Sequence, residues 1–451
     1  MYIQACYWSF GACLIAAHRS HFDEFVKKTA GLMLVQETVQ KPATIKYLPV
    51  TYATLYDYRL DIKEKIWVPW ESVVPAYVHD RQRNFSDILV PTVDTLRATW
   101  FVETMNRLGR PALLVGETGT SKTAIIQEFL RNLSRERYNQ LLINFSSRTT
   151  SIDVQRNIEA AVEKRTREIY GPPPGKKLLV FIDDMNMPML DTYGTQQPIA
   201  FLKFLLEKGR FYDRGGDLTL KYMKDLCYLA AMGEPGGGRN EVDPRFISMF
   251  SVYNVTIPST ETFGYIYTSI LGGHLEIFPE EVQGSAGELV EITLDLYQMV
   301  TRELLPTPNK FHYVFNMRDL SRITAGLLQS HPDYQPTTKQ MARLWRNECT
   351  RVICDRLISE QDEKLVAGYM KEKIGEHWEE KPKVIEYTLR DPLLFGDFRN
   401  AINDGEPRFY EDLLDYEAVY NLFVEVMQDT PTNSMLESLS RRSISLESQR
   451  P

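Results

Sequence analysis

The stretch RPALLVGETGTSKTAIIQEFL, residues 110–130, decides the fold that this sequence predicts. The apolar run ALLV indicates a short buried strand, and the residues after the glycine-containing turn have the apolar spacing of a helix. The turn matches the P-loop motif G-x-x-x-x-G-K-[ST] at Gly116, Lys122 and Thr123, whereas Ser121 stands at the position of the second motif glycine. Strand, turn and helix in this order predict a nucleotide-binding α/β domain.

A P-loop binds phosphate through backbone N–H groups that surround it at the N-terminus of a helix. Its lysine contacts the β- and γ-phosphates, and its Ser or Thr hydroxyl binds Mg²⁺. Ser121 is unfavourable if its position requires a positive φ, but its hydroxyl can donate to phosphate. We therefore expect ATP or ADP to contact the whole loop: Gly116, Glu117, Thr118, Gly119, Thr120, Ser121, Lys122, Thr123 and Ala124.

A second part of the site follows the apolar run LLVFI, where two carboxylates stand side by side. Asp183 ends the expected strand and is predicted to hold Mg²⁺ together with Thr123. The next residue in related sites is usually a glutamate that orients the attacking water, but here it is Asp184, whose side chain is one methylene shorter. A displacement of about 1 Å can reduce a rate about a hundredfold, so hydrolysis is in doubt while binding is not. The alternative is that both aspartates only cap a turn.

The wider pattern predicts an α/β domain over residues 85–257 with helices on both sides of a parallel sheet. The runs ALLV, QLLINF, KLLVFIDD and LCYLAAM are short and wholly apolar, as in parallel strands buried on both faces. The segment FYDRGGDLTLKYMKD predicts an inserted hairpin, and residues 51–75 predict short strands. We expect helices over residues 1–30 and 259–330, and a long helical stretch over 337–374.

Composition narrows the classes of partner. The 451 residues carry a net charge of −8, which argues against a chain that mainly binds nucleic acid. No apolar run approaches the roughly 18 residues of a membrane span. The five cysteines have no CxxC spacing and predict free thiols in a reducing compartment. We expect neither nucleic acid nor membrane as a partner.

Five stretches in a fixed order resemble the third AAA+ module of an axonemal dynein heavy chain. They are GETGTSKTA, FIDDMNMP, TYGTQQPIAFLKFLLEKGRFYDRG, AAMGEPGGGRNEVDPRFISMFSV and HYVFNMRDLSRI, and the first and third suggest an inner-arm subtype. The resemblance covers residues 1 to about 430 and implies an AAA+ P-loop module followed by a helical lid subdomain. It implies a helical end of the preceding module (1–45), a large α/β subdomain (46–257), a lid with a linking helix (258–372), and the start of the next module (373–430). The Ser- and Arg-rich tail (431–451) is predicted to be disordered.

The resemblance also implies roles for residues outside the P-loop. The loop before the first helix of the module would pack against adenine through Leu89, Val90, Pro91 and Thr92. In NMRDLSR, Arg318 would be the sensor arginine that acts on the γ-phosphate, with Arg322 as the second choice; without the family both are ordinary solvated arginines. In VDPRF, Arg245 would be an arginine finger that serves a neighbouring module's site.

One more departure concerns the end of the strand LAAM. Here the family usually has an asparagine that positions the attacking water, but this chain has Gly233, with Asn240 as a residue that would have to fold back. Ser121, Asp184 and Gly233 all affect turnover or loop geometry, whereas Lys122, Thr123 and Asp183 are kept. The pattern favours a regulatory module that binds ATP and hydrolyses it slowly or not at all. An active ATPase and a structural ring segment are the alternatives.

The resemblance finally implies partners and a location. The partners would be the neighbouring AAA+ modules of the dynein ring and the dynein intermediate and light chains. Microtubules would be contacted only through parts absent here, because no run sustains the heptad pattern of a stalk. We therefore expect a fragment or truncated product of a protein of the cytoplasm, the cytoskeleton and the ciliary axoneme.

Overall fold

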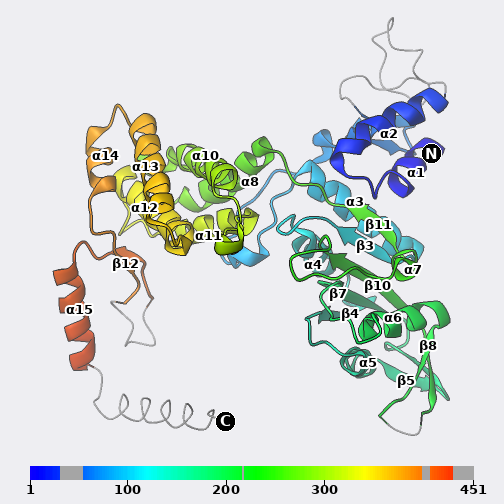
Figure 1. The fold of residues 1–451 in the computed structure, drawn as a ribbon. Coiled ribbons are helices and arrows are strands. Elements are labelled where there is room, and N and C mark those ends of the chain that lie inside the picture. The colour runs from blue at the N-terminus through cyan, green and yellow to red at the C-terminus, as the bar shows by residue number, and fades with distance from the viewer. Residues whose placement is uncertain (31–53, 216–217, 399–406, 430–451) are drawn as a thin grey trace, which may run out of the picture. The chain divides into compact units, whose positions relative to one another are not determined.

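The computed structural model describes residues 1–30, 54–215, 218–398 and 407–429. The chain divides into two compact units, the first made of residues 1–77 and 82–259 and the second of residues 78–81 and 260–451 (Figure 1). The predicted disordered tail, 431–451, lies outside the described residues, as do parts of the predicted segments 1–45 and 46–257. No helix in the described part of the chain is long and apolar enough to cross a membrane.

A five-stranded parallel sheet with the order β11-β3-β10-β7-β4 forms the centre of the first unit. Four of its strands lie where the apolar runs predicted them. The fifth strand, β11, was not predicted, because only one of its four residues is buried and it lacks an apolar run. The strands are β3 (Ala112–Val115), β4 (Tyr138–Asn144), β7 (Lys177–Asp183), β10 (Leu226–Met232) and β11 (Ser251–Asn254).

Helices cover both faces of this sheet, as predicted (Figure 1). Successive strand side chains point to opposite faces, so Phe181 joins one buried cluster while Val180 and Ile182 join the other. The first cluster includes Phe101 of α3 and Ile125 of α4, and the second includes buried residues of α5 and α6. The helices are α3 (Val93–Leu108), α4 (Lys122–Arg131), α5 (Ser151–Ala160), α6 (Gln197–Lys208) and the short α7 (Pro244–Ile247).

The predicted N-terminal helices belong to the first unit. Trp8 contacts the rings of Trp100 and Tyr253, so the helices pack on the α3 and β11 side of the sheet. The buried Asp23 accepts hydrogen bonds from Tyr7 and from the backbone of Leu55, each 2.7 Å long. The elements here are α1 (Tyr2–Ser9), α2 (Ala16–Thr29), the 3-10 turns η2 (Leu55–Asp57), η3 (Glu71–Val73) and η4 (Phe85–Asp87), and the hairpin of β1 (Tyr58–Asp61) and β2 (Ile66–Pro69).

A second sheet of four short strands, in the order β5-β6-β9-β8, includes the predicted inserted hairpin. The hairpin is the antiparallel pair β8 and β9, in which Phe211 faces Lys221. The other pair, β5 and β6, was not predicted, since β5 has the charged and largely exposed sequence EKRT. The strands are β5 (Glu163–Thr166), β6 (Ile169–Gly171), β8 (Arg210–Tyr212) and β9 (Leu220–Met223).

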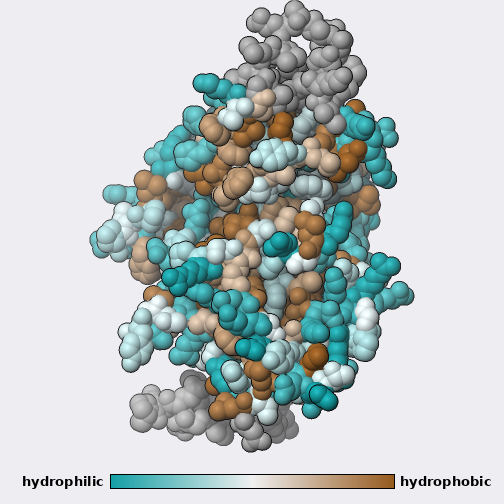
Figure 2. Space-filling model, turned by 90° about the vertical axis from the view of Figure 1, so that its right-hand side faces the viewer, coloured by the Kyte–Doolittle hydropathy of each residue, from teal (hydrophilic) through white to brown (hydrophobic). Residues whose placement is uncertain are grey.

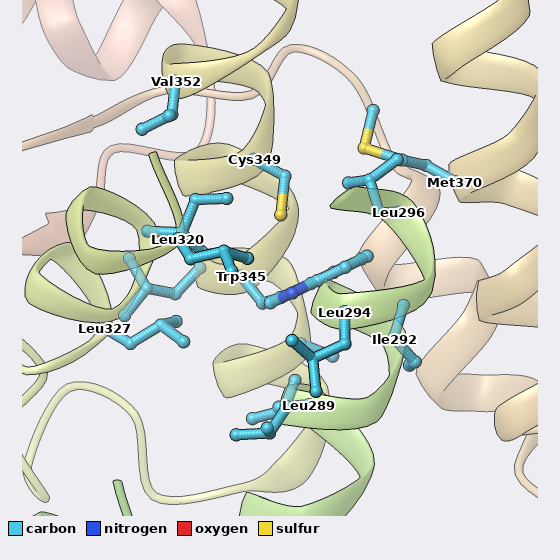
Figure 3. Packing of buried hydrophobic residues seen from close by; sticks show 14 of the residues in the cluster. Leu289, Ile292, Leu294, Leu296, Leu320, Leu327, Trp345, Cys349, Val352 and Met370 are labelled. Atoms are coloured by element: carbon cyan, nitrogen blue, oxygen red, sulfur yellow. The ribbon is translucent and has the colours of Figure 1, made fainter. Parts of the chain in front are cut away.

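The second unit is mainly helical and packs around Trp345, which is fully buried. Figure 3 shows Leu320, Leu327 and Cys349 around this ring, and its Nε1 donates a 2.7 Å hydrogen bond to Thr293. The helices are α8 (Thr260–Leu275), α9 (Glu280–Gln283), α10 (Ala286–Glu303), η5 (Pro308–Lys310), α11 (Met317–Leu327), α12 (Thr338–Val352), η6 (Cys354–Arg356), α13 (Glu360–His377) and α14 (Pro382–Leu389).

The long helical stretch expected over 337–374 is two helices. The chain leaves the helical conformation after α12, makes the turn η6, and is extended at Leu357 and Ser359. The next helix begins with Glu360, Asp362 and Glu363, and acidic residues stabilise a helix N-terminus through the macrodipole. Acidic residues directly after a serine are a signal for the start of a helix, and the spacing of apolar residues alone does not reveal it.

The residues after α14 are fastened to α12 by a buried arginine. Arg343 is 1% exposed; its Nε donates a 2.7 Å hydrogen bond to Asp412 and its Nη2 another of 2.7 Å to the carbonyl of Pro392. The segment includes β12 (Phe395–Gly396), which pairs with β13 (Glu411–Asp412), and is followed by α15 (Tyr416–Asp429).

The surface drawn in Figure 2 carries hydrophilic and hydrophobic residues interspersed with one another. Exposed apolar side chains among the described residues include Met189, Leu190 and Tyr193. Single exposed apolar residues are usual on folded proteins and carry no functional conclusion by themselves.

Candidate nucleotide site

The predicted P-loop connects β3 to α4, and its glycines are required by the backbone. A Cβ atom at Gly116 would lie 2.4 Å from the carbonyl oxygen of Val255, so no larger residue fits there without a shift of backbone. Gly119 has a φ of +94°, which side-chain-bearing residues rarely adopt. The two glycines therefore fix the path of the loop from the sheet into the helix.

Ser121 adopts the left-handed conformation, with φ at 57° and ψ at 18°. This is the condition under which the sequence predicted a cost for serine. The left-handed region is unfavourable for residues with a Cβ by roughly 1–2 kcal/mol. Ser121 nevertheless serves as the N-cap of α4, because its carbonyl accepts a 2.9 Å hydrogen bond from the N–H of Ile125.

Lys122 is the first residue of α4, and its side chain turns back into the P-loop. It is 9% exposed, and its Nζ donates to the carbonyls of Gly116 at 2.8 Å and Glu117 at 2.6 Å. Nζ also donates to Oγ1 of Thr120 at 3.2 Å, and that hydroxyl donates to the Glu117 carbonyl at 2.9 Å. The loop thus holds a buried positive charge at a helix N-terminus, an arrangement that suits an anionic phosphate.

Thr123 and Asp183 bring the start of α4 to the end of β7. Oγ1 of Thr123 donates to Oδ2 of Asp183 at 2.9 Å, and the N–H of Asp184 donates to Oδ1 at 3.0 Å. Burial raises the pKa of the Asp183 carboxyl; these two hydrogen bonds oppose the rise. A hydroxyl and a carboxylate are ligands that Mg²⁺ accepts, so the pair fits that ion. Ala124 follows in the first turn of α4.

Asp184 also has a positive φ, of 50°, which aspartate tolerates better than most residues. Its side chain is 46% exposed, and Oδ1 lies 3.7 Å from Nη2 of Arg239. The carboxylate is therefore accessible beside the P-loop and faces a positive charge. Its role as a catalytic base stays a prediction.

Arg239 is the residue of this site that sequence reasoning missed. Its Nη1 donates a 2.8 Å hydrogen bond to Oγ1 of Thr118 in the P-loop, and its side chain crosses the face of Gly233. Asn240 is held elsewhere, because its Nδ2 donates to the carbonyl of Pro188 at 2.8 Å. The signal was the run GGGRN, in which three glycines precede an arginine just after a central strand.

The predicted adenine-contacting segment leads into α3. Val90 is 3% exposed, whereas Leu89 and Pro91 are half-buried. Thr92 is the N-cap of α3, and its Oγ1 accepts a 3.2 Å hydrogen bond from the N–H of Thr95. Thr92 thus has a structural task whether or not a base lies nearby, and the adenine contact stays a prediction.

The predicted arginine finger, Arg245, lies in the first turn of α7 and is exposed. Asp243 caps this helix by accepting a 2.9 Å hydrogen bond from the N–H of Arg245, and it also accepts one of 2.6 Å from Lys203. The helix start is therefore fixed while the Arg245 side chain is exposed.

The predicted sensor arginines belong to the second unit. Arg318 is exposed in the first turn of α11, where its N–H donates to the capping side chain of Asn316 at 2.9 Å. Nη1 of Arg322 lies 3.4 Å from Oδ1 of Asp319. The role of Arg318 toward a nucleotide in the first unit stays a prediction.

Comparison with known proteins gives three family matches along the chain. Residues 77–258 match the P-loop containing dynein motor region, residues 289–385 the AAA+ lid domain, and residues 1–72 the dynein heavy chain AAA lid domain. These matches agree with the predicted P-loop module followed by a helical lid. The five predicted segment boundaries stay a prediction.

Individual relatives are dynein heavy chains. The chain is 53% identical to human dynein axonemal heavy chain 10 over 95% of its own length and 10% of that protein. It is 46% identical to the dynein-1-alpha heavy chain of the flagellar inner arm I1 complex of Chlamydomonas reinhardtii, over 95% of its length and 9% of that protein. Human dynein axonemal heavy chain 2 is 36% identical over 90% and 9%. The chain thus spans about a tenth of the length of these relatives.

Proposed function

Because the chain belongs to the family of axonemal dynein heavy chains, we propose that its first unit is an ATP-binding regulatory AAA+ module of such a motor. In this proposal the module is the third of the ring, and its nucleotide state influences how the main ATPase is coupled to the track-binding region. The motor as a whole would contribute to ciliary or flagellar motility.

The observation that carries this proposal is the arrangement of Lys122, Thr123 and Asp183. The ammonium of Lys122 lies within the P-loop, and Thr123 is hydrogen-bonded to the carboxylate that ends β7. These residues would hold the phosphates and Mg²⁺ of ATP or ADP. The bound Mg²⁺ would neutralise phosphate charge, while the residues of the chain orient the nucleotide.

Slow or absent hydrolysis is the second part of the proposal. Asp184 is shorter than the glutamate usual in related sites, its backbone is left-handed, and Arg239 lies 3.7 Å from its carboxylate. A general base must come within hydrogen-bond distance of the proton that it takes. Each of these features makes it harder for the Asp184 carboxylate to reach an attacking water. We therefore assign nucleotide binding, and not turnover, as the main property of the module.

Partners and location follow from the family and belong to the same proposal. The module would contact neighbouring AAA+ modules of the dynein ring, with the exposed Arg245 directed to a neighbour's site. Intermediate and light chains would join through the whole motor, and microtubules through parts outside this chain. The setting would be the cytoplasm and the cytoskeleton of the ciliary axoneme.

Calorimetric titration of the 451-residue chain with Mg·ATP and Mg·ADP tests the proposal. We expect saturable binding that Lys122→Ala abolishes, because the substitution removes the buried charge of the loop. Lys208→Ala is the matched control, since this lysine ends α6 and pairs only with the adjacent Glu207 in the described residues. If the folded wild-type chain binds neither nucleotide, the module is a structural ring segment. Fast phosphate release would instead identify an active ATPase.

A further inference from the structure

We propose that Arg239 contacts the terminal phosphate of a bound nucleoside triphosphate and makes the site prefer ATP over ADP. This inference rests on the proposed nucleotide site. At the end of strand β10, Gly233 has no side chain that could contact a phosphate, and the inference gives this task to Arg239.

Sheet topology puts Arg239 in the centre of the site. Strand β10 lies between β3, which precedes the P-loop, and β7, which ends at Asp183. Ligands of open parallel sheets bind at the carboxyl ends of the strands. The loop after β10 therefore emerges between the phosphate-binding loop and the pair Asp183 and Asp184.

The loop that carries Arg239 is held tightly. Gly236, Gly237 and Gly238 all have positive φ, of 120°, 57° and 89°. Gly236 and Arg239 exchange two backbone hydrogen bonds of 3.0 and 3.1 Å, which close a tight turn. At the start of the loop, Nδ2 of Asn186 donates a 2.8 Å hydrogen bond to the carbonyl of Gly233. A loop fixed in this way gives its arginine a defined direction.

The side chain of Arg239 occupies the space beside Gly233 that a Cβ atom would take. A Cβ atom there would lie 2.8 Å from Nε and 2.9 Å from Cζ of Arg239, both shorter than real contacts of this kind. Gly233 lacks the polar side chain that the family usually has at this position, and its small size leaves room for the Arg239 guanidinium. That guanidinium reaches the P-loop at Thr118.

The hydrogen-bonding capacity of this guanidinium is only partly used. Nη1 is bonded to Thr118, and Nη2 lies 3.7 Å from the Asp184 carboxylate, longer than a hydrogen bond. Nε is buried and has no hydrogen-bond partner in the part of the chain that the structure describes. Buried polar atoms normally have a partner. Arginine presents a planar set of donors that matches phosphate oxygens, so a phosphate beside Thr118 would accept hydrogen bonds from the two Nη groups.

A purely structural role is the competing explanation, in which Arg239 only fastens its loop to Thr118 and offsets the charge of Asp184. The two explanations differ in which nucleotide they affect. A ligand of the terminal phosphate matters for the triphosphate and not for the diphosphate. A structural arginine matters for both nucleotides or for neither.

The experiment measures the affinities of the full chain for Mg·ADP and for a non-hydrolysable Mg·ATP analogue by calorimetry. For Arg239→Ala we expect a loss of roughly 10- to 100-fold for the triphosphate analogue, the range expected for a hydrogen bond to a charged group. The affinity for ADP should change less than about threefold, which is below 0.7 kcal/mol. Arg239→Lys should restore part of the loss, and Arg156→Ala, at an exposed arginine of α5, should leave both affinities unchanged.

A second variant protects the test against misfolding. Gly233→Ala keeps the arginine but places a methyl group against its side chain, so it should also lower the preference for the triphosphate. Equal losses for both nucleotides, or unchanged affinities in both variants, would overturn the inference and leave the proposed nucleotide site intact. A wild-type chain that binds neither nucleotide would overturn both.

Discussion

Thr123 donates a 2.9 Å hydrogen bond to Asp183 and so joins the first turn of α4 to the carboxyl end of β7. The two residues belong to the two halves of the predicted site and lie far apart in the sequence. Their contact is the most direct structural support for treating the P-loop and the strand-end acid as one site.

Substituting Thr123 by valine removes the hydroxyl while keeping the size of the side chain. The half-buried Asp183 carboxylate then loses one of its donors, and because water can partly replace the hydroxyl, the cost should be at the lower end of the roughly 1–3 kcal/mol of an unsatisfied buried polar group. We expect lower stability in urea unfolding and a weaker affinity for Mg·ATP. Thr123→Ser retains the hydroxyl and should keep most of both properties, and equal behaviour of the two variants would show that the hydrogen bond is unimportant.

Ser121 offers a test of backbone strain in the P-loop. Ser121→Gly should stabilise the first unit by up to about 1–2 kcal/mol, because glycine has no Cβ to oppose the left-handed conformation. The greater freedom of glycine in the unfolded chain reduces this gain. Thermal unfolding measures the difference, and Gly119→Ala, at a φ of +94°, should change stability in the opposite direction. A destabilised Ser121→Gly would show that the serine hydroxyl contributes more than the strain costs.

His274 makes the stability of the second unit dependent on pH. Burial lowers the pKa of this imidazole to about 4, and its Nε2 lies 3.0 Å from Oγ of Ser330. The unfolded chain takes up a proton near pH 6.5 while the folded chain does not. Stability is therefore fully present above about pH 6.5 and is lost as the pH falls toward 4.

We expect the free energy of unfolding to fall by about 1–2 kcal/mol between pH 7 and pH 5 from this group alone. Urea unfolding at the two pH values should show a smaller decrease in His274→Gln than in the wild type. His18→Gln, at an exposed histidine of α2, is the control and should keep the wild-type decrease. An unchanged decrease in His274→Gln would mean that other groups cause it.

The sequence predicted what depends on strong local patterns. The buried strands β3, β7 and β10 have apolar runs, as does the edge strand β4, in which only Ile143 is buried. The P-loop has a fixed spacing, so the fold class and the phosphate loop could both be predicted. The strands β5 and β11 were missed, because short edge strands with few buried side chains carry little periodicity.

The contribution of Arg239 was missed for a different reason, although the run GGGRN was a signal for it. Its contact with Thr118 depends on three consecutive residues with positive φ and on the space beside Gly233. Neither is visible in a pattern of polar and apolar residues. The sequence identified Gly233 as a departure and named Asn240 only as a residue that would have to fold back; the Asn240 side chain instead donates to the carbonyl of Pro188.

Asp184→Glu tests why this site would bind without turnover. The longer side chain brings the carboxylate nearer to an attacking water, and since a misplacement of about 1 Å can cost about a hundredfold, we expect phosphate release to rise tenfold or more. Glutamate tolerates the φ of 50° less well than aspartate, so a small loss of stability should accompany the gain. The measurement is phosphate release by the full chain at saturating Mg·ATP, with Lys122→Ala in both backgrounds as the control for contaminating activity.

If Asp184→Glu binds Mg·ATP as tightly as the wild type but releases no more phosphate, the length of the Asp184 side chain is not what limits hydrolysis. The limit on hydrolysis would then lie in the left-handed backbone of Asp184 or in the nearby positive charge of Arg239. The double variant Asp184→Glu with Arg239→Ala separates these two explanations, because it removes the positive charge and leaves the backbone conformation.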